Sequence, residues 1–195
     1  KGIVILGLLI SPIFVYAHDV SGGDRLLLEN GGLVAFIWVG AKHMLTGYDH
    51  LLFLVGVIFF LTEFRQIVKF ITAFTIGHSI TLISATFLSI SVNEYLIDTI
   101  IGFSVFYKGF ENLGFFQKYL KINPPPLLHM VFAFGLIHGL GLSARLQSFT
   151  SSQDDILLKI VSFNLGVELG QVLALIPMVY LINMWRKKDS FKAFF

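Results

Sequence analysis

The sequence predicts an all-α membrane protein: a polytopic helical bundle of about five transmembrane helices that follows a cleavable signal peptide. Of its 195 residues, 55% are hydrophobic and only 13% are charged, and the mean hydropathy is +0.80. About a quarter of the residues of a soluble domain are charged, so this chain has too few charges to cover a surface that faces water. The length allows one domain. We therefore expect a signal peptide over residues 1–17 and a single membrane-embedded domain over residues 18–195.

The signal peptide is predicted from the first residues of the chain. Lys1 precedes an apolar run over residues 3–16, and Ala17 ends a cleavage pattern of small residues. The run is shorter than the roughly 20 residues that a membrane-crossing helix needs. Cleavage would leave His18 as the new N-terminus, outside the membrane. An uncleaved signal anchor is the alternative.

Five apolar stretches follow, separated by short polar segments, at residues 33–61, 70–90, 95–113, 127–142 and 156–185. Basic residues prevail in alternate connecting segments and in the C-terminal tail: Arg65, Lys69, Lys118, Lys121, Arg186, Lys187, Lys188 and Lys192. In the connection before the last stretch, Asp154 and Asp155 offset Arg145 and Lys159. Cytoplasmic loops of membrane proteins are enriched in Lys and Arg, so the alternation indicates that every second connection lies in the cytoplasm. It predicts an odd number of spans in a bacterial inner membrane, with the N-terminus outside and the C-terminus in the cytoplasm.

Glycines mark special positions within these stretches. The first stretch is longer than one span needs, and Gly47 lies among charged residues near its middle. We expect a break there, with an interfacial or re-entrant helix before it and the true span after it. Gly135 with Gly139, and Gly166 with Gly170, give two later spans smooth faces for close helix packing.

Ionisable residues inside the apolar stretches carry the strongest functional signal. Each costs about 2.5–3.5 kcal/mol at the centre of a bilayer, and the cost falls if several meet around a shared ion. The candidate metal ligands are His43, Asp49, His50, His78, His138 and Glu168. The supporting polar residues are Thr75, Glu111, Asn112, Asn164 and Gln171. We expect the first four ligands to meet in the outer half of the bundle, and His138 and Glu168 to face the same interior as a second stop.

Structural roles compete with this interpretation. Asp49 has the position of a helix cap, His78 shares a polar stripe with Thr75 that would serve helix packing, and His138 lies between packing glycines. Glu111 follows Lys108 at a span end, where a solvated pair is the simpler interpretation.

The donor set limits the partners. The chain has no cysteine, and imidazole with carboxylate suits zinc, nickel, cobalt, copper(II) or iron(II). The net charge of +2 is spread among loops and gives no footprint for nucleic acid. We expect the lipid bilayer and a divalent metal ion as partners. Association into a homo-oligomer or a larger membrane complex stays open.

Motifs around these residues resemble the HupE/UreJ family of hydrogenase- and urease-associated membrane proteins. The matching segments are residues 43–53, 74–82, 107–112, 134–141 and 163–171. The His43…Asp49-His50 pattern is also similar to the signature of the wider nickel/cobalt transporters. The resemblance implies a nickel or cobalt permease with the histidines and carboxylates as the metal path. An intramembrane zinc hydrolase, with zinc-activated water and Glu168 as an acid or base, is one alternative, and an accessory subunit is another.

Overall fold

The structure, a computed structural model, describes residues 22–149 and 155–192. The predicted signal peptide and His18 lie outside these ranges. Within them every regular element is a helix, which confirms the all-α class. The helices are α2 (Gly22–Asn30), α3 (Gly32–Thr46), α4 (Tyr48–Ile58), α5 (Phe64–Phe87), α6 (Glu94–Asn112), the π-helix η1 (Phe116–Leu120), α7 (Leu127–Phe149), α8 (Ile156–Arg186) and α9 (Asp189–Lys192).

The outer surface of the bundle is apolar. Large side chains on α5, α6 and α8 are between 47% and 64% exposed, including Ile76, Ile80, Phe103, Phe106, Leu165, Leu169, Val172 and Ile176. By length and composition, α5 and α8 can cross a membrane, whereas α3, α4 and Leu127–Ser143 of α7 are shorter apolar helices. Extended apolar surface of this kind marks contact with lipid or with other proteins rather than with water.

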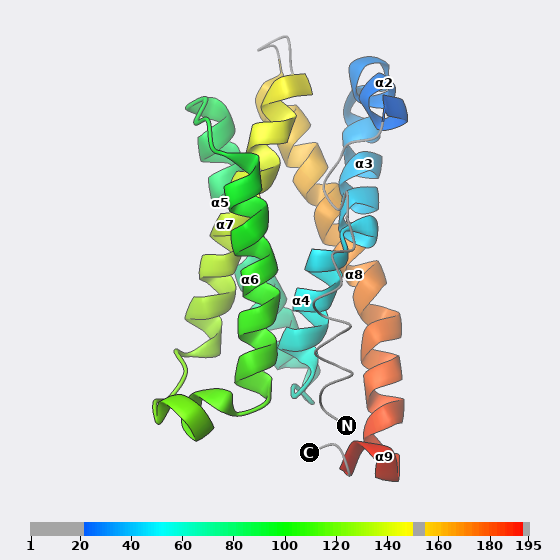
Figure 1. The fold of residues 1–195 in the computed structure, drawn as a ribbon. Helices are drawn as coiled ribbons and strands as arrows, with labels where there is room; N and C mark the ends of the chain where they lie inside the picture. The colour runs from blue at the N-terminus through cyan, green and yellow to red at the C-terminus, as the bar shows by residue number, and fades with distance from the viewer. Residues whose placement is uncertain (1–21, 150–154, 193–195) are drawn as a thin grey trace.

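The predicted break at Gly47 is confirmed, but its surroundings differ from our expectation. Gly47 has φ −73° and ψ 94° and separates α3 from α4. The true span expected after the break is not provided by α4 alone, because α4 has only 11 residues. α3 packs along α8, and its expected interfacial or re-entrant position stays a prediction. An eleven-residue helix is about 16 Å long, so only α3 and α4 together reach from one end of the bundle to the other (Figure 1).

Helices α3 and α8 form a closely packed parallel pair. A Cβ atom on Gly166 would lie 2.0 Å from the carbonyl oxygen of Ile37, so the two backbones touch where side chains normally separate helices. The contacts of this kind are Gly40 with Phe163, Gly166 with Ile37, and Gly170 with Ala41. Residue numbers increase together on both helices, so the helices run in the same direction. The predicted role of Gly166 and Gly170 in packing is confirmed.

Helices α5 and α7 form a second parallel pair with the same contacts in the same register. These contacts are Gly77 with Phe132, Gly135 with Phe74, and Gly139 with His78. Phe74, Gly77 and His78 of α5 take the places that Ile37, Gly40 and Ala41 have on α3. The next position also corresponds, because Met44 lies against Gly170 as Thr81 lies against Gly139. The packing role predicted for Gly135 and Gly139 is therefore also confirmed.

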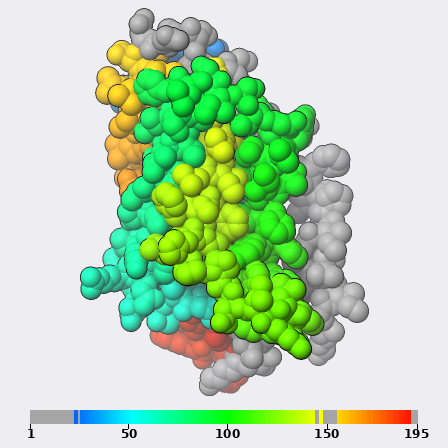
Figure 2. Space-filling view, turned by 90° about the vertical axis from the view of Figure 1, so that its left-hand side faces the viewer, coloured from blue at the N-terminus to red at the C-terminus, as the bar shows by residue number. Residues whose placement is uncertain are grey.

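The two pairs are antiparallel to each other. Thr75 bonds to Gln171 and Ser79 to Asn164, so numbers rise on α5 as they fall on α8. Figure 1 shows the α5/α7 pair and the α3/α8 pair on opposite sides of the bundle, with α6 in front of α4. Figure 2 shows the side of the molecule on which α7 lies at the surface, between α5 and α6. Two similar pairs of opposite direction thus enclose the middle of the bundle.

Candidate metal centre

The break between α3 and α4 holds two of the candidate ligands. The N–H of Gly47 donates to the carbonyl of His43 at 2.9 Å and ends α3, and α4 restarts with Asp49 and His50 in its first turn. A Cβ atom at position 47 would lie 2.9 Å from His50 Nδ1 and 3.3 Å from Asp49 Oδ1. A glycine is needed here because the two ligands fold back against its backbone.

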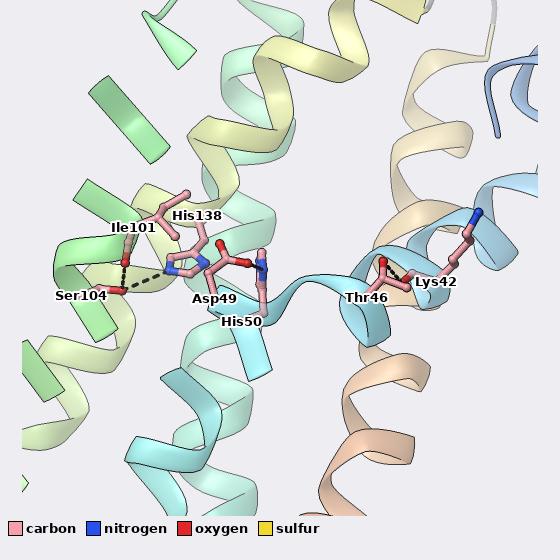
Figure 3. A network of polar contacts seen from close by, with 7 residues as sticks. All are labelled: Lys42, Thr46, Asp49, His50, Ile101, Ser104 and His138. Atoms are coloured by element: carbon pink, nitrogen blue, oxygen red, sulfur yellow. Dashed lines mark hydrogen bonds and ion pairs between the residues drawn. The ribbon is translucent and has the colours of Figure 1, made fainter. Parts of the chain in front are cut away.

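Asp49, His50 and His138 form a compact group. Each residue offers a ligand atom, and these atoms lie within 4.8 Å of one another. The rings of His50 and His138 have centroids 4.6 Å apart, and the two residues are 2% and 1% exposed. Figure 3 shows Asp49 with the rings of His50 and His138 on either side of it. One helix start and the middle of α7 thus bring two imidazoles and a carboxylate together.

Hydrogen bonds fix which ring nitrogens face the group. His50 Nδ1 lies 3.2 Å from Asp49 Oδ1, and a carboxylate oxygen accepts, so Nδ1 carries the proton. Ser104 Oγ donates to the carbonyl of Ile101 at 2.6 Å and lies 3.4 Å from His138 Nε2. Because the hydroxyl proton of Ser104 is already donated to Ile101, Ser104 Oγ accepts a hydrogen bond from the Nε2–H of His138. In these tautomers the lone pairs are on His50 Nε2 and His138 Nδ1, the nitrogens with which each ring binds a metal.

His43 and His78 are the two remaining histidines near this group. The His43 ring lies 5.2 Å from that of His50. His78 is 1% exposed and stacks on Phe74, and neither of its ring nitrogens has a hydrogen-bond partner in the described part of the chain. His43 thus lies beside His50, and His78 and His50 both pack against Phe74, whereas the expected meeting of all four residues in the outer half of the bundle stays a prediction. His138, predicted as part of a second stop, belongs to the same cluster.

Glu168 does not face this interior, and our expectation that it shares the interior with His138 is wrong. Asn164 and Gln171 turn toward α5, whereas Glu168 is exposed. At about 100° per residue, Glu168 is turned roughly 40° from Asn164 and 60° from Gln171, toward the outer surface. The glycines that face α3 occupy the opposite side of α8, so Glu168 falls at the edge of the exposed stripe.

The predicted supporting residues divide into two sets. Thr75 Oγ1 donates to Gln171 Oε1 at 2.9 Å, and Ser79 Oγ to Asn164 Oδ1 at 3.2 Å, so these bonds join the two pairs beside the cluster.

Glu111 and Asn112 serve a different contact, between α6 and α4. Glu111 pairs with Lys108 at 3.0 Å, and Asn112 donates to the carbonyl of Gly56 at 2.8 Å. Lys108 itself is only 4% exposed, and its side chain lies against Gly56. The solvated helix end expected here is thus an enclosed contact.

Sequence analysis missed Ser79 and Ser104. Each is a single hydroxyl in an apolar stretch, and its significance depends on a neighbouring helix that the sequence does not specify.

An apolar layer closes the cluster on the side where α5 begins. Phe53 lies 5.8 Å from the His138 ring, 5.6 Å from Phe74 and 5.5 Å from Phe134, measured between centroids. A small cavity beside His50 is lined by Met44, Phe53, Leu54, Val57, Phe70, Ile71, Phe74, Val131 and Gln171.

Fold and cluster together define an all-helical protein with an apolar exterior, helices suited to a membrane, and a buried site of imidazole and carboxylate. A family model described as HupE / UreJ protein matches residues 26–195. Because the match covers nearly the whole chain, the protein belongs to the HupE/UreJ family. No curated protein and no solved structure matches the chain.

Proposed function

We propose that the protein carries a divalent transition-metal ion across a membrane, with Asp49, His50 and His138 as the principal binding group. The observation that carries the proposal is that these three groups converge, nearly buried, inside an apolar bundle. Burying them separately would be costly, and a shared cation offsets that cost. The link of the family to nickel and cobalt transport or accessory roles supports these two ions as cargo.

The donor set suits such an ion. Two neutral imidazoles and one carboxylate offer nitrogen and oxygen without thiolate, the preference of nickel, cobalt and zinc. The carboxylate balances part of the ion's charge. His43 provides a further imidazole 5.2 Å from that of His50, and His78 provides another that packs, like His50, against Phe74. An ion can therefore exchange water for protein ligands stepwise.

We further propose that the end of the bundle bearing α9 faces the cytoplasm of a bacterial inner membrane. The α4–α5 connection, η1 and α9 lie at this end (Figure 1). The basic residues there include Arg65, Lys118, Lys121, Lys187 and Lys188. Basic residues are retained on the cytoplasmic side of membrane proteins. The exposed position of Glu168 weakens the hydrolase alternative, which needs that carboxyl at the metal as an acid or base.

The test is nickel and cobalt accumulation in cells that make wild-type protein, His50→Ala, His138→Ala and His78→Ala at matched membrane levels. His129→Ala is the matched control, because His129 lies on α7 but is exposed. We expect loss of accumulation in the first three variants and wild-type accumulation in the control. Elemental analysis of the purified proteins should show bound metal lost in the same variants.

Equal accumulation in all four variants and wild type would refute transport. Hydrolysis of a lipid or amide by the purified wild type, lost on His50→Ala, would instead establish the enzyme.

A further inference from the structure

The cluster is enclosed, so an ion can reach it only if helices move. His50, His78 and His138 are 2%, 1% and 1% exposed. The apolar layer around Phe53 closes one side of the cluster. The hydrogen bonds from Thr75 and Ser79 to α8, which join the two helix pairs, lie beside it. Any movement that opens the site must separate elements that contact each other here.

The contacts divide the bundle into two bodies. The α3/α8 pair is held by backbone contact at its glycines. α4 belongs to the other body, because Asn112 of α6 bonds to Gly56, and α6 in turn packs on α7, where a Cβ on Gly141 would lie 3.0 Å from Ile97. The second body is therefore α4, α5, α6 and α7. It contains Asp49, His50, His78 and His138, and the α3/α8 body contains His43.

The boundary between these bodies crosses the chain at Gly47. A helix cannot bend sharply without losing backbone hydrogen bonds, but α3 has already ended at Thr46 and α4 restarts at Tyr48. Gly47, with no side chain, joins the bodies at the edge of the cluster. Hinges are a few element-terminal residues that absorb changes in φ and ψ.

Contacts between the bodies are unequal along the bundle. Beside the cluster they include two neutral side-chain hydrogen bonds, Thr75 to Gln171 and Ser79 to Asn164. Where α4 ends, the Arg186 guanidinium of α8 donates to the carbonyls of Ile58, Phe59 and Leu61. A charged group that binds several helix-end carbonyls is a stronger link than a neutral pair.

We propose that the α3/α8 pair swings as a rigid body against α4–α7, with Gly47 as hinge and Arg186 as the fixed end, and that this movement opens the metal cluster where Ser79 meets Asn164. The inference rests on the proposed transport function and adds the moving parts. The opposite direction of two otherwise similar pairs fits the general pattern of transporters, in which one repeat rocks against the other around a central site.

The test uses disulfides, because the natural chain has no cysteine. Ser79→Cys with Asn164→Cys joins the two bodies beside the cluster, and Thr75→Cys with Gln171→Cys is a second pair at the same boundary. Ile97→Cys with Gly141→Cys is the matched control, because both residues lie in the α4–α7 body. Nickel uptake is measured for each oxidised and reduced protein, with disulfide formation measured by mass spectrometry.

We expect oxidation to stop uptake through both boundary pairs, reduction to restore it, and the control disulfide to leave it unchanged. A long flexible bis-methanethiosulfonate spacer across Ser79→Cys and Asn164→Cys should permit uptake that the direct disulfide prevents. Uptake that continues through a fully formed boundary disulfide would overturn the proposal while leaving transport intact. The control disulfide stopping uptake, or neither boundary pair forming a disulfide, would also overturn it. An absence of uptake by the wild-type protein would instead overturn transport itself.

Discussion

Where α5 carries His78, the corresponding position of α3 is Ala41, and where α7 carries His138, the corresponding position of α8 is Leu169. The backbone contacts of the two helix pairs are otherwise the same, glycine for glycine. Their exposures differ sharply, since Leu169 is 50% exposed and His138 is 1% exposed. Similar packing thus supports a binding group in one pair and a plain outer surface in the other.

Part of the difference comes from α6, which packs on α7, and part from α4, whose His50 and Phe53 rings lie 4.6 Å and 5.8 Å from that of His138. Ile97 and Ile101 of α6 pack against Gly141, and Ser104 of α6 contacts His138. Within the described residues, no helix covers Leu169 in the same way. The small residues therefore set the distance between paired helices, and the helices that cover a pair, α6 and α4, decide which position becomes a buried site.

The largest expected effect comes from the packing shared by both pairs. Gly135→Ala places a Cβ 2.3 Å from the carbonyl oxygen of Phe74, and Gly166→Ala places one 2.0 Å from that of Ile37. Backbone atoms cannot rotate away, so we expect each change to cost about 1–3 kcal/mol of stability. Thermal unfolding in detergent measures this cost.

Gly102→Ala on α6 is the control, because a Cβ there meets no atom within 4 Å. Alanine favours a helix by about 1 kcal/mol over glycine, so this change should not destabilise the protein. If Gly135→Ala destabilises and Gly166→Ala does not, the two pairs are not equivalent in packing.

Exchanging the corresponding residues tests the chemical difference. His138→Leu removes one imidazole while keeping an apolar side chain of comparable bulk against Phe53. Even loss of a residue that only supports a ligand costs about 10- to 100-fold in metal affinity, so loss of the ligand should cost at least that. Isothermal titration with nickel measures the affinity.

Leu169→His makes the reverse change at the exposed position. It should add no binding of its own, because an imidazole there faces outward. A gain of bound metal in Leu169→His, or wild-type affinity in His138→Leu, would contradict the role given to α6.

Particular residues show how far the sequence alone could lead. The break at Gly47, the packing glycines and the cluster of His43, Asp49 and His50 follow from residues close together in the chain. The presence of His138 in the metal cluster and the outward position of Glu168 do not follow from the local sequence. Helical periodicity gives the angle between residues on one helix, but in a chain with an apolar exterior it does not tell which face meets a neighbour. That choice depends on where α6 and α5 lie.

The break at Gly47 has no counterpart on α5, which continues through 24 residues. Gly47→Ala should push the His50 ring, because the new Cβ would lie 2.9 Å from Nδ1. We expect metal affinity to fall by about 10- to 100-fold, the range for a disturbed ligand. Because the Cβ would also lie 3.0 Å from the carbonyl oxygen of His43, the unfolding temperature should fall, but less than in Gly135→Ala. Gly109→Ala, in open space on α6, should leave affinity unchanged. An unaltered affinity in Gly47→Ala would show that the ring position is not set by this glycine.

The smallest expected effect concerns Ser104, the contact by which α6 fixes His138. Its Oγ lies 3.4 Å from Nε2, a long hydrogen bond, so its removal should weaken metal binding by about tenfold, the lower end of the range for a supporting partner. Ser143→Ala is the matched control, because Ser143 is equally buried and donates to the carbonyl of Leu140 on its own helix. Nitrogen NMR of labelled histidine in the metal-free proteins gives the second measurement. In wild type we expect His138 to be protonated at Nε2, and in Ser104→Ala we expect a mixture of tautomers, because no acceptor then selects one. An unchanged tautomer together with unchanged affinity would mean that α6 buries His138 without orienting it, and the difference between the two pairs would then be one of coverage alone.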